Sequence, residues 1–298
     1  MQTSEAVDPS RVRESYVPVP GARVYVREVG TGPPLFILHG GPDFNHNYLL
    51  PDMDRLASAF RLIYYDQRGR GKSSPGVAPE DVTIESEVED LDLLRQSLGL
   101  EAISVLGHSW GGLLAMEYAT RHPDRVGHVI LMNTAPATHA DLMGFRGRRE
   151  TAEAQALARM RAIAATSDYA SGDIDTEAEY YRAHFGATLS RAEHLDRVVR
   201  SLRSDFTPAD IVKARAIEDR LYEQTWMLPE YDLIARLRVA KTRMLVLHGD
   251  RDFVPVACAE RIAAAVPGSR LIVLSDCGHF AYLERPDEVR DAIVACLT

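Results

Sequence analysis

Short, nearly continuous apolar runs recur along this chain and limit the folds open to it more than any other feature. Such runs are typical of strands that a parallel sheet buries on both faces. Apolar residues at spacings of three and four lie between them, as from Ile84 to Leu98, and predict amphipathic helices on those faces. A run at 23–29 alternates between apolar and polar residues, which predicts an antiparallel edge strand. The predicted buried strands are PLFILHG (34–40), RLIYYD (61–66), AISVLG (102–107), HVILMN (128–133), MLVLHGD (244–250) and RLIVLSD (270–276).

The pattern changes at about residue 138, and no convincing strand follows until about residue 236. Four segments there are helical by propensity: 150–165, 176–186, 190–203 and 208–225. One sheet interrupted by a helical insertion explains this order better than two successive domains do. We therefore expect an α/β core of residues 1–137 and 237–298. The insertion, residues 138–236, is expected to form a helical cap above the carboxyl ends of the strands, where open parallel sheets bind ligands.

Three reactive side chains follow predicted strands. Ser109 lies in the turn GHSWGG after the third buried strand, Asp252 follows the fifth, and His279 follows the sixth. A serine, an acid and a histidine in this chain order, with a G-x-S-x-G turn between strand and helix, are typical of the α/β-hydrolase fold. The sequence therefore predicts that fold, with a mostly parallel sheet, flanking helices and an inserted helical cap.

These three residues form a predicted catalytic triad. The Ser109 hydroxyl is a poor nucleophile until a base removes its proton, and an imidazole such as that of His279 can do so near neutral pH. Asp252 is expected to orient the imidazole and to stabilise its protonated form. The backbone amides of Trp110 and Gly41 are the predicted oxyanion donors. The expected chemistry is hydrolysis through an acyl-enzyme.

Other polar residues after the strands are expected to be structural. Asp250 competes with Asp252 for the role of the acid, but we expect it to brace its loop. The strand at 128–133 ends in Asn133 and offers no acid. Asp66 and Arg68 are expected to pin loops by hydrogen bonds, because their run, DQRGRGKS, lacks the spacing of a phosphate-binding loop. Three histidines are also expected to be structural: His39, His108 and His248.

Charge and composition argue against several partners. A net charge of −9 disfavours nucleic acid and anionic membranes, and no stretch approaches the roughly 18 apolar residues of a membrane helix. Three scattered cysteines, without a signal peptide, favour the reducing cytoplasm and predict no metal site. The basic cluster of Arg146, Arg148 and Arg149 is expected to lie in a solvated loop rather than in a binding patch.

Three motifs together resemble those of the proline iminopeptidases: HGGP (39–42), DQRGRGKS (66–73) and GHSWGG (107–112). That family removes an N-terminal residue, usually proline, from peptides without a metal or organic cofactor. The resemblance implies a short-peptide substrate and cap carboxylates that bind its free ammonium group. The segment RAIEDRLY resembles the cap segment that carries one such carboxylate, here Glu218. Asp43 departs from the family motif, which usually continues as HGGPG.

Two alternatives remain open. GHS-x-G also occurs in esterases and lactonases, and a small neutral ester would suit apolar cap residues such as Trp226, Met227 and Leu228. Trp226 is therefore a predicted substrate contact. The other alternative is a non-catalytic binding protein that keeps the pocket, which the presence of all three catalytic residue types disfavours.

Overall fold

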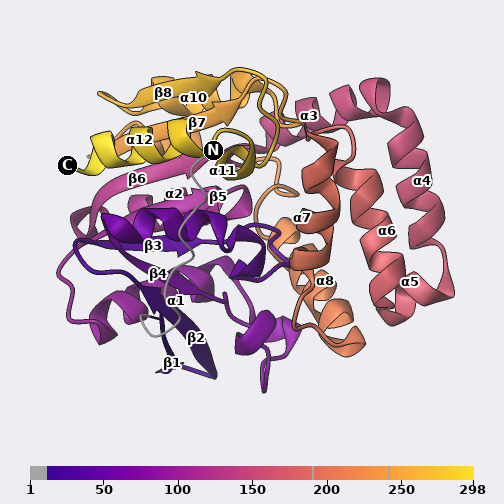
Figure 1. Cartoon of the computed structure of the whole chain (residues 1–298), viewed down its shortest axis with the longest axis horizontal. Coiled ribbons are helices and arrows are strands. Elements are labelled where there is room, and N and C mark those ends of the chain that lie inside the picture. The colour runs from indigo at the N-terminus through magenta and orange to yellow at the C-terminus, as the bar shows by residue number, and fades with distance from the viewer. Residues whose placement is uncertain (1–11, 190, 241) are drawn as a thin grey trace.

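The structure is a computed structural model that describes residues 12–189, 191–240 and 242–298. Its centre is one eight-stranded sheet with helices on both faces (Figure 1). The strand order is β1-β2-β4-β3-β5-β6-β7-β8, and pairing is parallel from β4 across to β8. This mostly parallel sheet confirms the predicted fold class. The strands are β1 (Val12–Val19), β2 (Ala22–Val29), β3 (Pro34–Leu38), β4 (Arg61–Tyr65), β5 (Ile103–His108), β6 (Val126–Met132), β7 (Arg243–Gly249) and β8 (Arg270–Leu274).

The antiparallel edge differs from the sequence prediction. The strand predicted at 23–29 is β2, which is antiparallel to β4 as expected, but it does not lie at the edge. β1 pairs along its other side, with Tyr16 opposite Tyr25. Most β1 side chains are exposed, and Val17 and Val19 near its end pack against the core, so β1 carries too short an apolar pattern to predict a strand.

The sheet separates two buried apolar clusters. Along β3, Phe36 and Leu38 belong to one cluster, whereas Leu35 and Ile37 belong to the other, as expected of a strand buried on both faces. Helices contribute apolar residues to each cluster. Those on the first face are α1 (Ile84–Ser97), α2 (Trp110–Arg121) and α10 (Val256–Ala265), and α11 (Ala281–Glu284) and α12 (Pro286–Leu297) lie on the second.

The chain between β6 and β7 is mainly helical, and Figure 1 shows most of it gathered on one side of the sheet. Helices occur in all four predicted segments, although residue 190 lies outside the described residues. The helices are α3 (His139–Ala152), α4 (Ala154–Ala164), α5 (Ser167–Ser171), α6 (Ile174–Phe185), α7 (Leu195–Leu202), α8 (Pro208–Glu223) and α9 (Leu233–Leu237).

The arginine cluster lies in a helix, contrary to the loop expected from the sequence. Helix α3 begins where the Thr138 side chain accepts a hydrogen bond from the Asp141 amide at 3.0 Å. This N-cap starts the helix well before the predicted segment at 150–165. Arg149 consequently sits on a helix facing the interior and is buried, whereas Arg146 and Arg148 are exposed.

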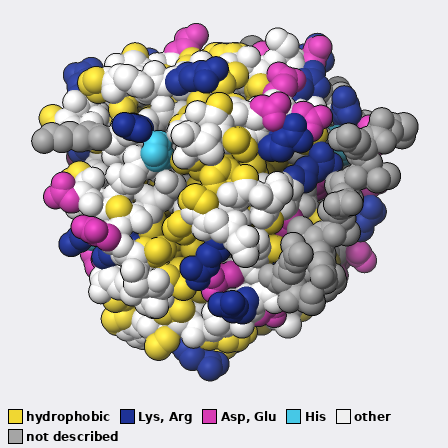
Figure 2. Space-filling model, turned by 60° about the vertical axis from the view of Figure 1, so that its left-hand side comes forward, with side chains coloured by type: hydrophobic (Ala, Val, Ile, Leu, Met, Phe, Trp, Pro, Cys, Tyr) yellow, Lys and Arg dark blue, Asp and Glu magenta, His cyan; other side chains and the backbone are white. Residues whose placement is uncertain are grey.

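Charged side chains of both signs are interspersed on the face shown in Figure 2. Among the described residues, no helix is long and apolar enough to cross a membrane. The same part of the chain contains no group of three or more His, Cys, Asp or Glu side chains arranged to hold a metal ion.

Candidate active site

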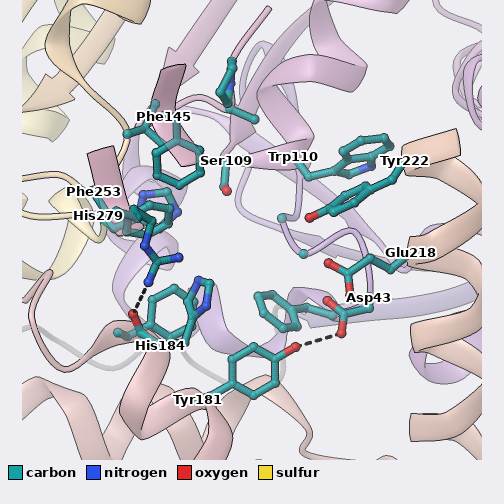
Figure 3. Close-up of a pocket in the computed structure, with 18 of the residues that line it drawn as sticks. Asp43, Ser109, Trp110, Phe145, Tyr181, His184, Glu218, Tyr222, Phe253 and His279 are labelled. Carbon is teal, nitrogen blue, oxygen red and sulfur yellow. Dashed lines mark hydrogen bonds between the residues drawn. The ribbon is translucent and has the colours of Figure 1, made fainter. Parts of the chain in front are cut away.

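Ser109 occupies a tight turn between β5 and α2. Its φ of 54° is positive, which residues with a Cβ rarely adopt. Glycines make the turn possible, because a Cβ on Gly107 would collide with the backbone of Gly111, and a Cβ on Gly111 with the Leu38 carbonyl. The turn presents the Ser109 side chain to a pocket at the carboxyl end of β5 (Figure 3).

His279 and Asp252 form a hydrogen-bonded pair. Nδ1 of His279 lies 2.9 Å from Oδ1 and 3.0 Å from Oδ2 of Asp252. With the proton on Nδ1 donated to the carboxylate, Nε2 is an acceptor, as a general base requires. Burial opposes ionisation of Asp252. The imidazoles of His279 and His248 and hydrogen bonds from His279 and Asn133 nevertheless hold its pKa below the ordinary value.

Asn133 connects the acid to the histidine loop. Its Nδ2 donates to Oδ2 of Asp252 at 2.8 Å and to the carbonyl of Gly278 at 2.9 Å, while its Oδ1 accepts from the Ala281 amide at 3.3 Å. The residue is fully buried and has a φ of 47°. One carboxamide therefore holds both sides of the loop that carries His279.

Ser109 and His279 line the same pocket, one from the turn after β5 and the other from the loop after β8. Within the described part of the chain, the Ser109 hydroxyl makes no hydrogen bond with the His279 imidazole. Catalytic hydrogen bonds in ligand-free sites are often long and tighten when substrate binds. The structure thus brings the predicted serine and histidine to one pocket and joins the histidine to the predicted acid.

The two predicted oxyanion donors, Gly41 and Trp110, also line this pocket. Trp110 is the first residue of α2, so its amide has no acceptor within the helix. Gly41 has a φ of 117°, and a Cβ there would collide with the Asp43 amide, so the turn requires glycine. Among the described residues, the Gly41 amide donates to no other group, which leaves it available to a ligand.

A chain of hydrogen bonds connects the oxyanion turn to the histidine loop. The Gly40 amide donates to the Tyr48 hydroxyl at 2.7 Å, and that hydroxyl donates to Nδ1 of His108 at 2.7 Å. Nε2 of His108 then donates to the His279 carbonyl at 2.8 Å. Burial, followed by the nearby His279, lowers the pKa of His108 to about 3, so the ring is neutral. The structural role predicted for His108 is confirmed.

The run DQRGRGKS holds loops together, as predicted. The Gln67 amide donates to Nε2 of His39 at 3.0 Å, which ties the run to the His-Gly-Gly-Pro turn. Asp66 accepts hydrogen bonds from the amide of His46, in the loop after β3, and from the amide of Lys72, within the run itself. Arg68 makes a bidentate pair with Asp90 of α1, with distances of 2.9 and 2.5 Å. These contacts fix the loop that carries Gly41.

Two further structural predictions hold beside the candidate acid. Asp250 accepts a hydrogen bond from the Cys277 amide at 3.1 Å and so braces the loop, as expected. His248 is buried, and its Nε2 donates to the Val254 carbonyl at 2.8 Å. Neither residue lines the pocket.

The pocket has a volume of about 490 Å³, within the range of small-molecule sites. Its two sides differ in chemistry (Figure 3). On one side of Ser109 lie the carboxyl groups of Asp43 and Glu218. On the other side lie His279 and Phe253, whose ring centroids are 4.3 Å apart.

Asp43 is held by two neighbours from the helices between β6 and β7. Its Oδ2 accepts a hydrogen bond from the Tyr181 hydroxyl at 2.8 Å and forms an ion pair with Arg203. Arg203 also pairs with Glu177 at 2.7 Å, so one guanidinium is shared between two buried carboxylates. The residue that departs from the family motif therefore contributes a fixed carboxylate to the pocket.

Glu218 lies on α8, next to Asp43 in the pocket (Figure 3). Burial, followed by the negative charge of Asp43, raises the pKa of Glu218 well above its ordinary value. Tyr222 and Arg203 act in the opposite sense but do not reverse the shift. A cation beside this carboxyl group would favour its ionised form, because an opposite charge stabilises the carboxylate.

Trp226 forms part of the pocket wall near Trp110. Its Nε1 donates to the Pro136 carbonyl at 2.8 Å, and its ring meets that of Trp110 edge-on at 5.4 Å. Met227 and Leu228, expected as apolar cap contacts, do not line the pocket and are 48% and 39% exposed. They follow Trp226 after α8 has ended, so the chain turns them outward.

Comparison with known proteins identifies the family. A model of the alpha/beta hydrolase fold matches residues 33–286. The chain belongs to the alpha/beta hydrolase fold family. The proline iminopeptidase of Lactobacillus helveticus (strain DPC 4571) is 29% identical over 297 residues, covering 92% of this chain and 94% of the relative. The crystal structure of the Mycobacterium smegmatis proline iminopeptidase is 25% identical, with a TM-score of 0.70 and coverage of 95% and 97%. The esterase EaEST from Exiguobacterium antarcticum has the same TM-score at 23% identity, with coverage of 95% and 98%.

As an alpha/beta hydrolase with these relatives, the protein is a hydrolase. The sequence analysis assigned no role in the site to Asp43 and Arg149, which line the pocket, or to Asn133, which positions Asp252 and the His279 loop. Asn133 was noted only as the absence of an acid, Asp43 only as a departure from a motif, and Arg149 only as part of a solvated cluster. The departure at Asp43 was the one signal in the sequence that could have pointed to the pocket.

Proposed function

We propose that this protein is a serine hydrolase that removes the N-terminal residue from short peptides, in the manner of the proline iminopeptidases. The observation that carries the proposal is the pair of carboxyl groups, Asp43 and Glu218, on one side of Ser109. A free ammonium or imino group is costly to desolvate without a counter-charge. This pair supplies that counter-charge at one end of the pocket.

In the proposed reaction, Ser109 Oγ attacks the carbonyl carbon while Nε2 of His279 takes its proton. The carboxylate of Asp252 stabilises the resulting imidazolium through Nδ1. The amides of Gly41 and Trp110 donate to the oxyanion. The carbon–nitrogen bond then breaks as His279 gives the proton to the leaving amine. Water, deprotonated by His279, attacks the acyl carbon, and the bond to Ser109 Oγ breaks as His279 returns the proton to that oxygen.

Glu218 is proposed to anchor the amine of the substrate. Its raised pKa means that the carboxyl group holds a proton more tightly than usual when the pocket is empty. An ammonium group beside it reverses this preference, so binding is coupled to ionisation of Glu218. Asp43 adds a second negative charge whose orientation Tyr181 and Arg203 fix.

Residues 138–236 are proposed to act as a cap on a core of residues 1–137 and 237–298. The support is that the pocket is lined from both parts: Gly41, Ser109 and His279 come from the core segments, and Glu218 and Trp226 from the insertion. A cap that contributes the amine anchor would select the substrate, while the core carries out the reaction.

The test uses a matched pair of variants on α8. Glu218→Gln should raise KM for prolyl p-nitroanilide by about 10- to 100-fold, since it removes one charged hydrogen-bond partner. It should have little effect on a neutral p-nitrophenyl ester. Glu223→Gln makes the same change at an exposed position outside the pocket and should leave both substrates unaffected. Brisk ester hydrolysis without any cleavage of amino-acid anilides would reject the aminopeptidase.

The second candidate is a carboxylesterase or lactonase for small neutral substrates. Aromatic rings on the pocket wall favour it, namely those of Phe145, Phe185, Phe253 and Trp226. This candidate predicts that Glu218→Gln leaves KM unchanged for its best substrate. Fluorophosphonate labelling that is lost in Ser109→Ala would exclude a non-catalytic binding protein in either case.

A further inference from the structure

A buried cation lies on the side of the pocket opposite Asp43 and Glu218. Arg149 of α3 lines the pocket with only 7% of its surface exposed. Its guanidinium carbon lies 5.2 Å from the centroid of the Phe253 ring, and that ring lies 4.3 Å from the His279 ring. One aromatic ring therefore separates the cation from the candidate general base.

The hydrogen bonds of Arg149 use only part of its guanidinium. Nε and Nη2 contact Oε2 of Glu153 at 2.9 and 2.8 Å, and Nη2 donates to the His184 carbonyl at 3.3 Å. Nη1 has no hydrogen-bond partner among the described residues. Nη1 is not among the buried polar atoms that lack a partner, so it is open to solvent and can donate to an acceptor in the pocket that Arg149 lines.

The other polar side chains on this side of the pocket make no hydrogen bond to Nη1 of Arg149 among the described residues. Burial, followed by the charge of Arg149, lowers the pKa of His184 well below its ordinary value, so its ring is neutral. Glu150 also lines the pocket, but it is exposed and its carboxylate pairs with Arg161 at 3.2 Å. Arg146 lines the pocket as well, yet it is exposed, and its Nη1 contacts Sδ of Met227, beyond Trp226.

The proposed reaction fixes which part of the substrate reaches this cation. The leaving nitrogen must accept its proton from His279, so the leaving group lies on the His279 side while the N-terminal amine lies toward Glu218. If the leaving group is a free amino acid, its carboxylate is two bonds from that nitrogen. A carboxylate can accept from the free edge of a guanidinium in a charge-assisted hydrogen bond.

Resting on the function proposed above, we infer that Arg149 binds the C-terminal carboxylate of the substrate and that the preferred substrates are dipeptides. The pocket then has one charged end for each end of the dipeptide zwitterion. A longer peptide carries an uncharged amide at this position and forfeits the interaction with Arg149.

The test compares prolylglycine with prolylglycinamide, which differ at the charged end. The wild-type enzyme should prefer the dipeptide in kcat/KM by about 10- to 100-fold, as one charge-assisted hydrogen bond allows. Arg149→Met should bring this ratio close to one. Arg149→Lys keeps the positive charge but loses the planar set of guanidinium donors, so it should give an intermediate ratio. Arg148→Met, a neighbouring exposed arginine outside the pocket, should keep the wild-type ratio.

A wild-type ratio of kcat/KM for the dipeptide over its amide that is close to one overturns the inference. A preference for the dipeptide that Arg149→Met leaves unchanged also overturns it. So does a preference that is lost in Arg146→Met and kept in Arg149→Met. Calorimetry on Ser109→Ala separates binding from turnover. If the wild-type enzyme cleaves no prolyl amide but Ser109→Ala binds the dipeptide more tightly than its amide through Arg149, the proposed function fails and the carboxylate site stands. Turnover of both compounds with equal affinities overturns the carboxylate site and leaves the proposed function intact.

Discussion

The carboxamide of Asn133 donates a hydrogen bond of 2.8 Å to Asp252 and another of 2.9 Å to the carbonyl of Gly278, the residue before His279. The candidate acid and the backbone of the candidate base are therefore held by one side chain. Asn133 is a positioning residue in this arrangement, because it contacts neither the pocket nor a reacting atom.

Removal of this carboxamide should slow catalysis more than it weakens substrate binding. Asn133→Gly keeps the left-handed conformation accessible and removes the buried carboxamide together with its hydrogen bonds. We expect kcat to fall by about 10- to 100-fold with KM within a factor of about three, the scale seen when groups that orient a reactive residue are lost. Steady-state kinetics on the best substrate measures this split. A variant that raises KM with kcat intact would show that Asn133 does not position the pair.

Asp252→Asn should reduce kcat by about 10³- to 10⁴-fold, because the amide stabilises the wrong imidazole tautomer. Asp250→Asn is the matched control and should retain activity, since Asp250 binds the loop backbone outside the pocket. If Asp250→Asn were the inactive variant, the acid would be assigned to the wrong residue.

The pairing of Asp252 with His279 should also affect the stability of the fold. The pKa of Asp252 is depressed in the folded state, so its ionised form contributes stability above its unfolded pKa of about 3.9. That contribution disappears as the pH falls through the folded pKa. Wild type should therefore be more stable than Asp252→Asn at pH 7, and the difference in free energy of unfolding should shrink below about pH 4. Urea titrations at pH 7 and below about pH 4 measure this difference in free energy of unfolding.

Much of the core fold could be predicted because its signals are local. A strand buried on both faces, such as β3, needs a continuous apolar run wherever it sits in the sheet. The serine turn needs glycine at positions 107 and 111 because the backbone packs against them. β1 could not be predicted in this way, since most of its side chains are exposed and carry no regular pattern, and its pairing with β2 is a backbone contact.

The polar environment of the site depends on contacts between distant segments. Asp43 is held in the pocket by Tyr181 and by Arg203, which lies 160 positions away. Arg149 is buried where α3 packs against other segments: its Nη2 donates to the His184 carbonyl of α6, and its guanidinium lies over the Phe253 ring. No spacing within one segment encodes these pairings. The roles of Ser109, Asp252 and His279, and the cap boundaries, stay predictions that kinetics must test.

Alanine substitutions at Gly111 and Gly144 should change the stability of the protein in opposite directions. A Cβ on Gly111 would collide with the backbone carbonyls of Leu38 and His39, which have no room to move, whereas a Cβ on Gly144 of α3 would meet nothing within 4 Å. Gly111→Ala should destabilise the protein by about 1–3 kcal/mol or more. Gly144→Ala should stabilise it by about 0.5–1 kcal/mol through helix propensity. Chemical denaturation checks both signs, and a tolerated Gly111→Ala would mean that the serine turn is looser than described.

Glu218 should make the folded protein less stable as the pH rises. Its folded pKa is raised, so its favourable contribution is fully present below the unfolded pKa of about 4.3 and is lost as the pH rises through the folded value. Glu218→Gln cannot ionise. It should match wild type near pH 4 and exceed it at pH 8 by about 1–3 kcal/mol, the cost of a poorly paired, partly buried group.

A ligand with a free amine should cancel the difference in stability between wild type and Glu218→Gln at pH 8. Prolinamide places a cation beside Glu218, so it should raise the melting temperature of wild type at pH 8 more than that of Glu218→Gln. Glu223→Gln, exposed on the same helix, should behave as wild type at both pH values. If Glu218→Gln were less stable than wild type at pH 8, the carboxylate would already have a partner in the empty pocket. The amine would then have no unpaired charge to meet, because Asp43 is already paired with Arg203, and the proposed anchor would be wrong.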